Sequence, residues 1–206
     1  MKNIKTYLLY FLILVYVSGS IGFIIKPSFF APFTPLSLLL TCGVFLIHQP
    51  INKNYIIGFV MVSLIGFVSE LVGIKTGLIF GNYHYGSGLG TKLEGVPIII
   101  SLNWALIVTA ALGVSNKLFE NKCLISISSA TIATGIDLLM EQVAPTLNFW
   151  YFDNGLAGIH NYIGWFAISF IASALFYDYL KKTDYKISVI TLALQLLFFG
   201  IIYTFN

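Results

Sequence analysis

Long apolar stretches separated by short polar segments are the dominant pattern in this chain of 206 residues. A helix needs about 20 mostly apolar residues to cross the hydrocarbon core of a bilayer. Seven windows meet or approach that length, and they cover residues 7–25, 35–49, 55–74, 95–115, 124–140, 161–180 and 187–203. The pattern therefore predicts an all-α protein, with one membrane domain of about seven transmembrane helices over residues 1–206.

The first window follows Lys2 and Lys5, an arrangement that could be mistaken for a signal peptide. Its apolar run is longer than the 7–15 residues typical of a signal sequence, so we interpret it as a retained first span. With seven spans the termini lie on opposite sides. Eight of the eleven lysines fall on the N-terminal side, which predicts a cytoplasmic N-terminus in the cell membrane.

Composition agrees with a membrane location. Hydrophobic residues make up 58% of the chain and charged residues 9%, against roughly 25% charged residues in a typical soluble domain. The lysines are scattered and form no basic stripe, so the expected partner is membrane lipid and not nucleic acid. Cys42 and Cys123 lie far apart, within or beside apolar runs, and form no disulfide framework. The oligomeric state is not fixed by any of these features.

Four acids are the clearest candidates for chemistry: Glu70, Asp137, Glu141 and Asp153. Acids within membrane spans are costly and usually face the bundle interior or a water-filled cavity. All four fall toward the non-cytoplasmic end, and Asp137 and Glu141 are one helical turn apart on one face. The alternative is that they bond to lysines or hydroxyls and hold helices together. Only two lysines lie near that face, so some of the acids are expected to be protonated or solvated.

Other chemistries have little support. His48, His84 and His160 are isolated from one another, which argues against a metal site. No phosphate-binding loop or nucleophile elbow is present, and we expect no cofactor. The two long loops, 75–94 and 141–160, are rich in glycine and aromatic residues. Such loops are typical of a lid over a site, although Tyr and Trp also favour the headgroup interface. Gly73 and Gly77 have the spacing of a close helix–helix contact. The alternative is that such glycines allow a tight turn or bring the backbone close to a ligand.

Two stretches resemble the CruF-type carotenoid biosynthesis proteins, a family of carotenoid 1,2-hydratases that includes bisanhydrobacterioruberin hydratase. The first is ELVGIKTGLIFGNYHY at 70–85, followed by LGTK at 89–92, GVP at 95–97 and a tryptophan at 104. The second contains Asp137, Glu141 and Pro145, then FWY at 149–151 and NYIGW at 161–165. The family usually has a proline shortly before the Asn-Tyr pair, and this chain has Gly-Ile-His there.

The resemblance implies hydration of the terminal double bond of an acyclic carotenoid to a tertiary alcohol. Such a reaction needs a carboxylic acid as proton donor, a carboxylate to orient water, and aromatic faces near the cation. Asp137 is the expected donor, and Glu70 and Glu141 are the candidates for orienting water. The expected substrate-binding residues are Tyr83, Tyr85, Trp150, Asn161 and Trp165.

Two other functions stay open at this point. A carotenoid cyclase of the lycopene type would share the protonation step, but a neighbouring double bond would capture the cation. A membrane carrier or channel would use the acids as an ion path, although no inverted repeat supports that function.

Overall fold

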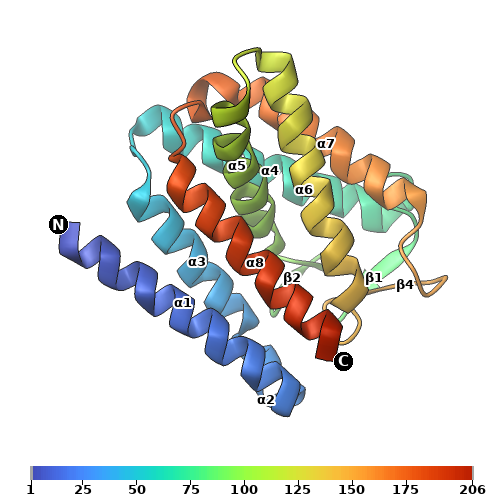
Figure 1. Ribbon diagram of the computed structural model, residues 1–206. Helices are drawn as coiled ribbons and strands as arrows, with labels where there is room; N and C mark the ends of the chain where they lie inside the picture. Colours follow the sequence, from blue (N-terminus) through green and yellow to red (C-terminus); the bar gives the residue numbers. More distant parts are fainter. Residues whose placement is uncertain (1, 206) are drawn as a thin grey trace.

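The computed structural model describes residues 2–205 and consists of a helical bundle with short strands at one end (Figure 1). A short helix α2 (Pro27–Phe30) and a 3-10 turn η1 (Ala31–Phe33) lead into the second long helix. The seven long helices are α1 (Lys2–Ile25), α3 (Thr34–His48), α4 (Lys53–Thr76), α5 (Ile100–Leu118), α6 (Lys122–Val143), α7 (Ile159–Leu180) and α8 (Tyr185–Phe205). Each apolar window of the sequence falls on one of them, which confirms the predicted all-α bundle.

Six of the helical stretches are long and apolar enough to cross a membrane, with α2, η1 and α3 forming one continuous stretch. The seventh helix, α5, is the central one, and it contacts α3, α4, α6, α7 and α8. Every residue from Trp104 to Leu112 is fully buried. A helix that is enclosed on all sides can carry polar residues such as Asn103 and Thr109, because its neighbours and not lipid surround it.

The short strands were not predicted, and they lie in the segments that connect α4 to α5 and α6 to α7. They are β1 (Tyr83–Tyr85), β2 (Lys92–Leu93), β3 (Val96–Pro97) and β4 (Trp150–Phe152). β2 and β3 form a hairpin around Glu94 and Gly95, which both have positive φ, as a tight hairpin turn requires. The prediction of helix from residue 95 was therefore wrong by five residues, because Val96 and Pro97 pair with β2 and α5 begins only at Ile100.

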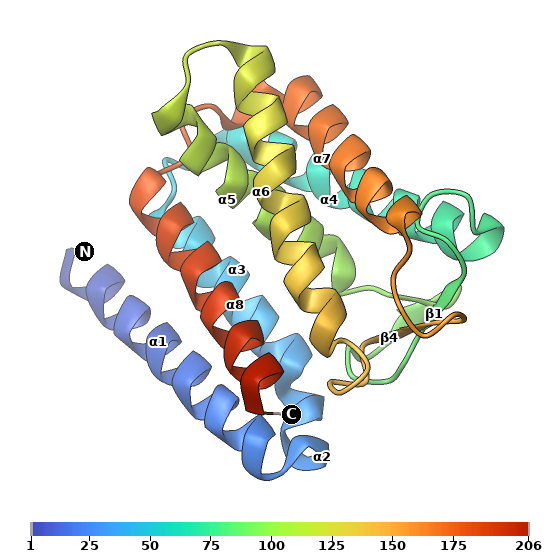
Figure 2. The same cartoon turned by 45° about the vertical axis from the view of Figure 1, so that its right-hand side comes forward.

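The α1 helix lies at the outer edge of the bundle. It packs against α2, α3 and α8, and Figure 2 shows it separated from α6 and α7 by α8. On the other side, α4 and α7 pack against each other, and α7 also packs against α6. The strands β1 and β4 lie where α4, α6 and α7 meet (Figure 2).

The expected helix–helix contact at Gly73 and Gly77 is not what the structure contains. Gly77 ends α4 in the left-handed conformation, with φ of 67°, and its N–H donates to the Gly73 carbonyl at 2.8 Å. The nearest atoms to a Cβ built on Gly73 belong to Phe80 and Tyr83, in the loop that follows. These glycines therefore allow the loop to fold back against the end of α4.

Gly66 is the glycine that permits close packing of two helices. A Cβ at this position of α4 would lie 2.3 Å from both Cβ and Cγ of Trp104 on α5. Those atoms are close to the backbone and cannot swing away. Gly66→Ala should therefore lower the free energy of unfolding by about 1–3 kcal/mol, the usual cost of overpacking.

The measurement is the midpoint of thermal unfolding in detergent. Gly43→Ala is the matched control, because nothing lies within 4 Å of a Cβ built on Gly43. Equal midpoints for the two variants would contradict close packing at Gly66.

Candidate active site

A small polar chamber lies inside the bundle, beside the β1–β4 ribbon. Eight of the nine predicted site residues line it, all except Asp153, together with three apolar side chains that were not predicted, Phe80, Ile100 and Phe152. Its free volume is about 10 Å³, which is about the space that one water molecule needs. The chamber thus combines carboxyl groups, aromatic faces and room for a single water.

The β1–β4 pairing explains which loop residues face the chamber. Side chains alternate between the two faces of a strand, and the register places Tyr83 opposite Phe152 and Tyr85 opposite Trp150. All four of these residues line the chamber. His84, which lies between the two tyrosines, is exposed and stacks on Tyr151 with ring centroids 5.5 Å apart.

The same ribbon rules out one predicted acid. The Asp153 side chain is 61% exposed and lies 3.9 Å from His84 Nδ1 on the outer surface. The expectation that Asp153 joins the other three acids was therefore wrong, because it follows β4 on the side away from the chamber.

Glu70, near the end of α4, is held by three donors. The hydroxyl of Tyr83 donates to Oε2, and the hydroxyl of Tyr85 donates to the same oxygen at 2.8 Å. The indole N–H of Trp104 donates to Oε1 at 2.8 Å. The sequence indicated Trp104 only as part of the family pattern. Its contact with Glu70 was not predicted, because the two residues lie on different helices, 34 positions apart.

Asp137 and Glu141 share one donor, the side-chain amide of Asn161 in the first turn of α7. Asn161 Nδ2 lies 2.7 Å from Asp137 Oδ2 and 3.1 Å from Glu141 Oε1. Glu141 also accepts from the indole N–H of Trp150 at 2.8 Å. The other oxygen of Asp137, Oδ1, is buried and has no hydrogen-bond partner among the described residues. It is the unsatisfied polar atom of the chamber's acids.

The nearby lysines do not neutralise the chamber. Lys75 pairs with Glu94 at 3.0 Å on the surface, and Lys92 donates to the backbone carbonyl of Tyr85 at 2.5 Å. Across residues 2–205, no ion pair involves Glu70, Asp137 or Glu141. The same part of the chain contains no group of three His, Cys, Asp or Glu residues placed to bind a metal ion.

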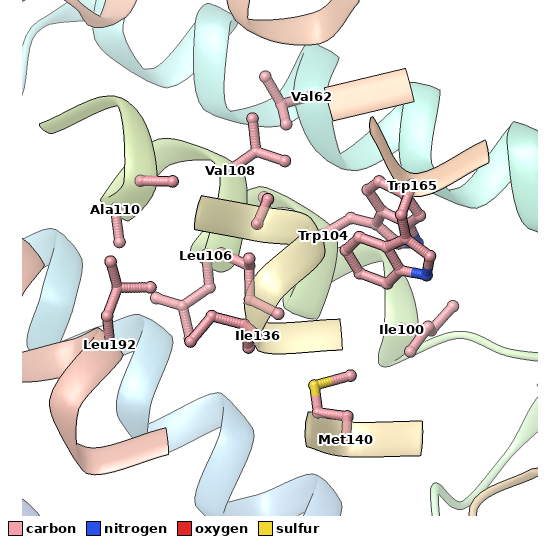
Figure 3. Close-up of a cluster of buried hydrophobic side chains, with 14 of the residues drawn as sticks. Val62, Ile100, Trp104, Leu106, Val108, Ala110, Ile136, Met140, Trp165 and Leu192 are labelled. Carbon is pink, nitrogen blue, oxygen red and sulfur yellow. The ribbon is translucent and has the colours of Figure 1, made fainter. Parts of the chain in front are cut away.

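Aromatic rings form one wall of the site. Trp104 and Trp165 stack with ring centroids 3.7 Å apart and planes 11° from parallel, and Figure 3 shows their overlapping indoles above Ile100. Phe80 lies 6.1 Å from the Trp104 ring, and Tyr83 lies 5.3 Å from Phe152. Their π faces suit a transient positive charge.

The fold and the site define an integral membrane protein with a buried cluster of acids. The chain belongs to the carotenoid biosynthesis protein family, and all the site residues lie within the matched part of the chain. The family model matches residues 33–206. A curated relative, the bisanhydrobacterioruberin hydratase of Haloarcula japonica, is 28% identical over 152 residues. The match covers 68% of this chain and 50% of that relative's length, so the chain spans about half of the relative. No solved structure matches the chain significantly.

The two tyrosines that bind Glu70 should resist ionisation. Burial raises the pKa of both phenols, and the adjacent Glu70 raises it further. While folded, the wild type and a Tyr83→Phe/Tyr85→Phe variant should gain equal tyrosinate absorbance as the pH passes 10, the ordinary pKa of tyrosine. Above that pH the unfolded chain binds fewer protons than the folded one, so these two groups make stability fall as the pH rises.

An absorbance titration in detergent, followed by alkaline unfolding, provides the measurement. The wild type should gain two additional tyrosinates only on unfolding. A difference between the two proteins before unfolding would contradict the buried, donating tyrosines.

Proposed function

We propose that this protein is a carotenoid hydratase that adds water to the terminal double bond of an acyclic carotenoid and forms a tertiary alcohol. Membership of the carotenoid biosynthesis family supports the substrate class. The name of the Haloarcula japonica relative supports the reaction. The single observation that carries the proposal is the unpartnered Oδ1 of Asp137 in a chamber with room for about one water.

Asp137 is the proton donor in this proposal. Its Oδ2 accepts from Asn161 at 2.7 Å, which leaves Oδ1 as the oxygen that carries the proton. The O–H of Asp137 gives that proton to the less substituted alkene carbon. A C–H bond forms, the π bond breaks, and a tertiary cation remains on the neighbouring carbon.

Glu141 orients the water that captures the cation. It shares Asn161 with Asp137, so water held by Glu141 would lie beside the donor. As the water oxygen bonds to the cationic carbon, Glu141 accepts a water proton. Transfer of this proton back to Asp137, one helical turn away, resets the site. The net reaction adds one water and needs no cofactor.

Glu70 has a different role from Glu141. Its oxygens already accept from Tyr83, Tyr85 and Trp104, so it has little capacity left to orient water. We assign it as the fixed negative charge that stabilises the cation. Glu70 lines the chamber, and Trp104, one of its donors, stacks on Trp165, another lining residue.

The membrane orientation is also a proposal. The N-terminus would lie in the cytoplasm of the producing cell, since most lysines fall at that end of the bundle. The acid chamber would then lie toward the outer face of the cell membrane, among lipid and its hydrophobic substrate.

The first test is expression in a bacterium that accumulates lycopene, with pigments analysed by liquid chromatography and mass spectrometry. A product heavier by one water with an unchanged polyene spectrum is expected. The cyclase alternative shares the donor and the aromatic wall, and it predicts a product of unchanged mass with a shortened chromophore. That product would overturn the hydratase proposal.

The acid assignment has its own test. Asp137→Asn and Glu141→Gln should each lower the hydration rate by at least about 100-fold, the usual contribution of general acid–base catalysis. Asp178→Asn is the matched control, because Asp178 is 65% exposed at the opposite end of the bundle and pairs with Lys122 and Lys181 on the surface. Hydration by the Asp137→Asn variant at the control's rate would refute the assigned donor.

A further inference from the structure

A second, larger cavity lies between the N-terminal helices and the rest of the bundle. Its volume is about 390 Å³. Most of the side chains that line it come from α1, α2, α3 and α8, and seven phenylalanines dominate the walls: Phe23, Phe29, Phe30, Phe33, Phe149, Phe198 and Phe199. The residues lining it on α1 run from Val15 to Phe23, which is about 12 Å at 1.5 Å per residue. The space is mostly apolar and suited to a hydrocarbon chain.

This cavity adjoins the acid chamber. Ile100 and Trp150 line both spaces. Met140, the neighbour of Glu141, lines the apolar cavity, and Figure 3 shows it below Ile100. Trp150 also bonds to Glu141, so the partition between the two spaces consists of one isoleucine and a tryptophan attached to the catalytic machinery.

The outer wall of the cavity comes from a part of the chain outside the family match. That match begins at residue 33, whereas α1 and α2 end at Ile25 and Phe30. α1 packs against α2, α3 and α8, and the acids lie on α4 and α6. The wall is therefore structurally separate from the catalytic residues.

We infer that the α1–α2 segment forms the outer wall of an isoprenoid-binding channel and determines which chain lengths are accepted. The inference rests on the proposed hydratase function. The free volume of the acid chamber, about 10 Å³, holds no more than a water molecule, so Ile100 and Trp150 have to move aside for the reactive end of the substrate to reach Asp137. The adjoining polyene lies against the phenylalanines, and the remainder extends past α1 into the lipid.

Two glycines of α1 shape this channel. A Cβ on Gly22 would lie 2.3 Å from the Phe30 ring, so Gly22 provides the recess in which Phe30 sits. Gly19 lines the cavity, and its nearest neighbour to a built Cβ is Phe198 at 3.9 Å, an ordinary contact distance. Position 19 therefore accepts a larger side chain, which would project into the channel.

Gly19→Phe is the test variant. It should lower conversion of a full-length acyclic carotenoid by at least about tenfold, since small changes in an apolar pocket have effects of that size. A short acyclic isoprenoid with the same end group should be converted as before. Val17→Phe is the matched control, because Val17 lies on the same helix, is 51% exposed and does not line the cavity.

A binding measurement separates this inference from the proposed reaction. In the Asp137→Asn background, carotenoid should copurify with the Val17→Phe protein and be lost from the Gly19→Phe protein. Both proteins should elute alike on size-exclusion chromatography, and Gly19→Leu replaces the variant if Gly19→Phe does not fold.

Equal amounts of copurified pigment in the Val17→Phe and Gly19→Phe proteins would contradict the proposed channel. Equal loss of activity on long and short substrates in the Gly19→Phe protein would also contradict it. Failure of the wild type to convert either substrate would refute the hydratase and leave the pigment result to decide the channel.

Discussion

The structure depends on burying three carboxyl groups in a membrane bundle without a cation beside them. An isolated carboxylate in an apolar medium is very costly, so donors must compensate for the lost water. Here the donors are phenols, indoles and one amide, all of them neutral. Glu70 is satisfied by Tyr83, Tyr85 and Trp104, and Glu141 by Trp150 and Asn161. These same side chains form the aromatic surroundings that a carbocation would need.

That requirement accounts for the unusual loops. A loop that only connects two spans is normally short. Here the two loops contain β1 and β4, which pair with each other and cover one side of the chamber. The alternation in β1 turns both tyrosines inward and His84 outward. Without the ribbon, Glu70 would lose two of its three donors.

Much of the fold and the site could be predicted from the sequence, for physical reasons. A helix that crosses lipid must be long and apolar, so the seven long helices could be predicted from the seven apolar windows of the sequence. The cost of an acid within a span identified Glu70, Asp137 and Glu141 as residues that must face one another or water. The aromatic residues of the site were selected through the family resemblance, and all of them line the chamber.

The rest depends on tertiary contacts that leave no local pattern. The contact of Trp104 with Glu70 joins two helices, and the exposure of Asp153 depends on the β1–β4 register. The cavity against α1 depends on how an otherwise ordinary apolar helix packs on α8. Periodicity and composition are the same whether such a helix faces a cavity or lipid.

The β1–β4 ribbon also sets an order of events during synthesis. β1 is made before α5 and α6, whereas its partner strand β4 follows α6. The strand with Tyr83 and Tyr85 can therefore pair only after α5 and α6 have been synthesised. Before that stage the β1–β4 ribbon does not cover the chamber, and Asp137 and Glu141 have no bond to Asn161, because α7 has not yet been made. The acid chamber is complete only when α7 is in place, although most of the bundle has already been inserted.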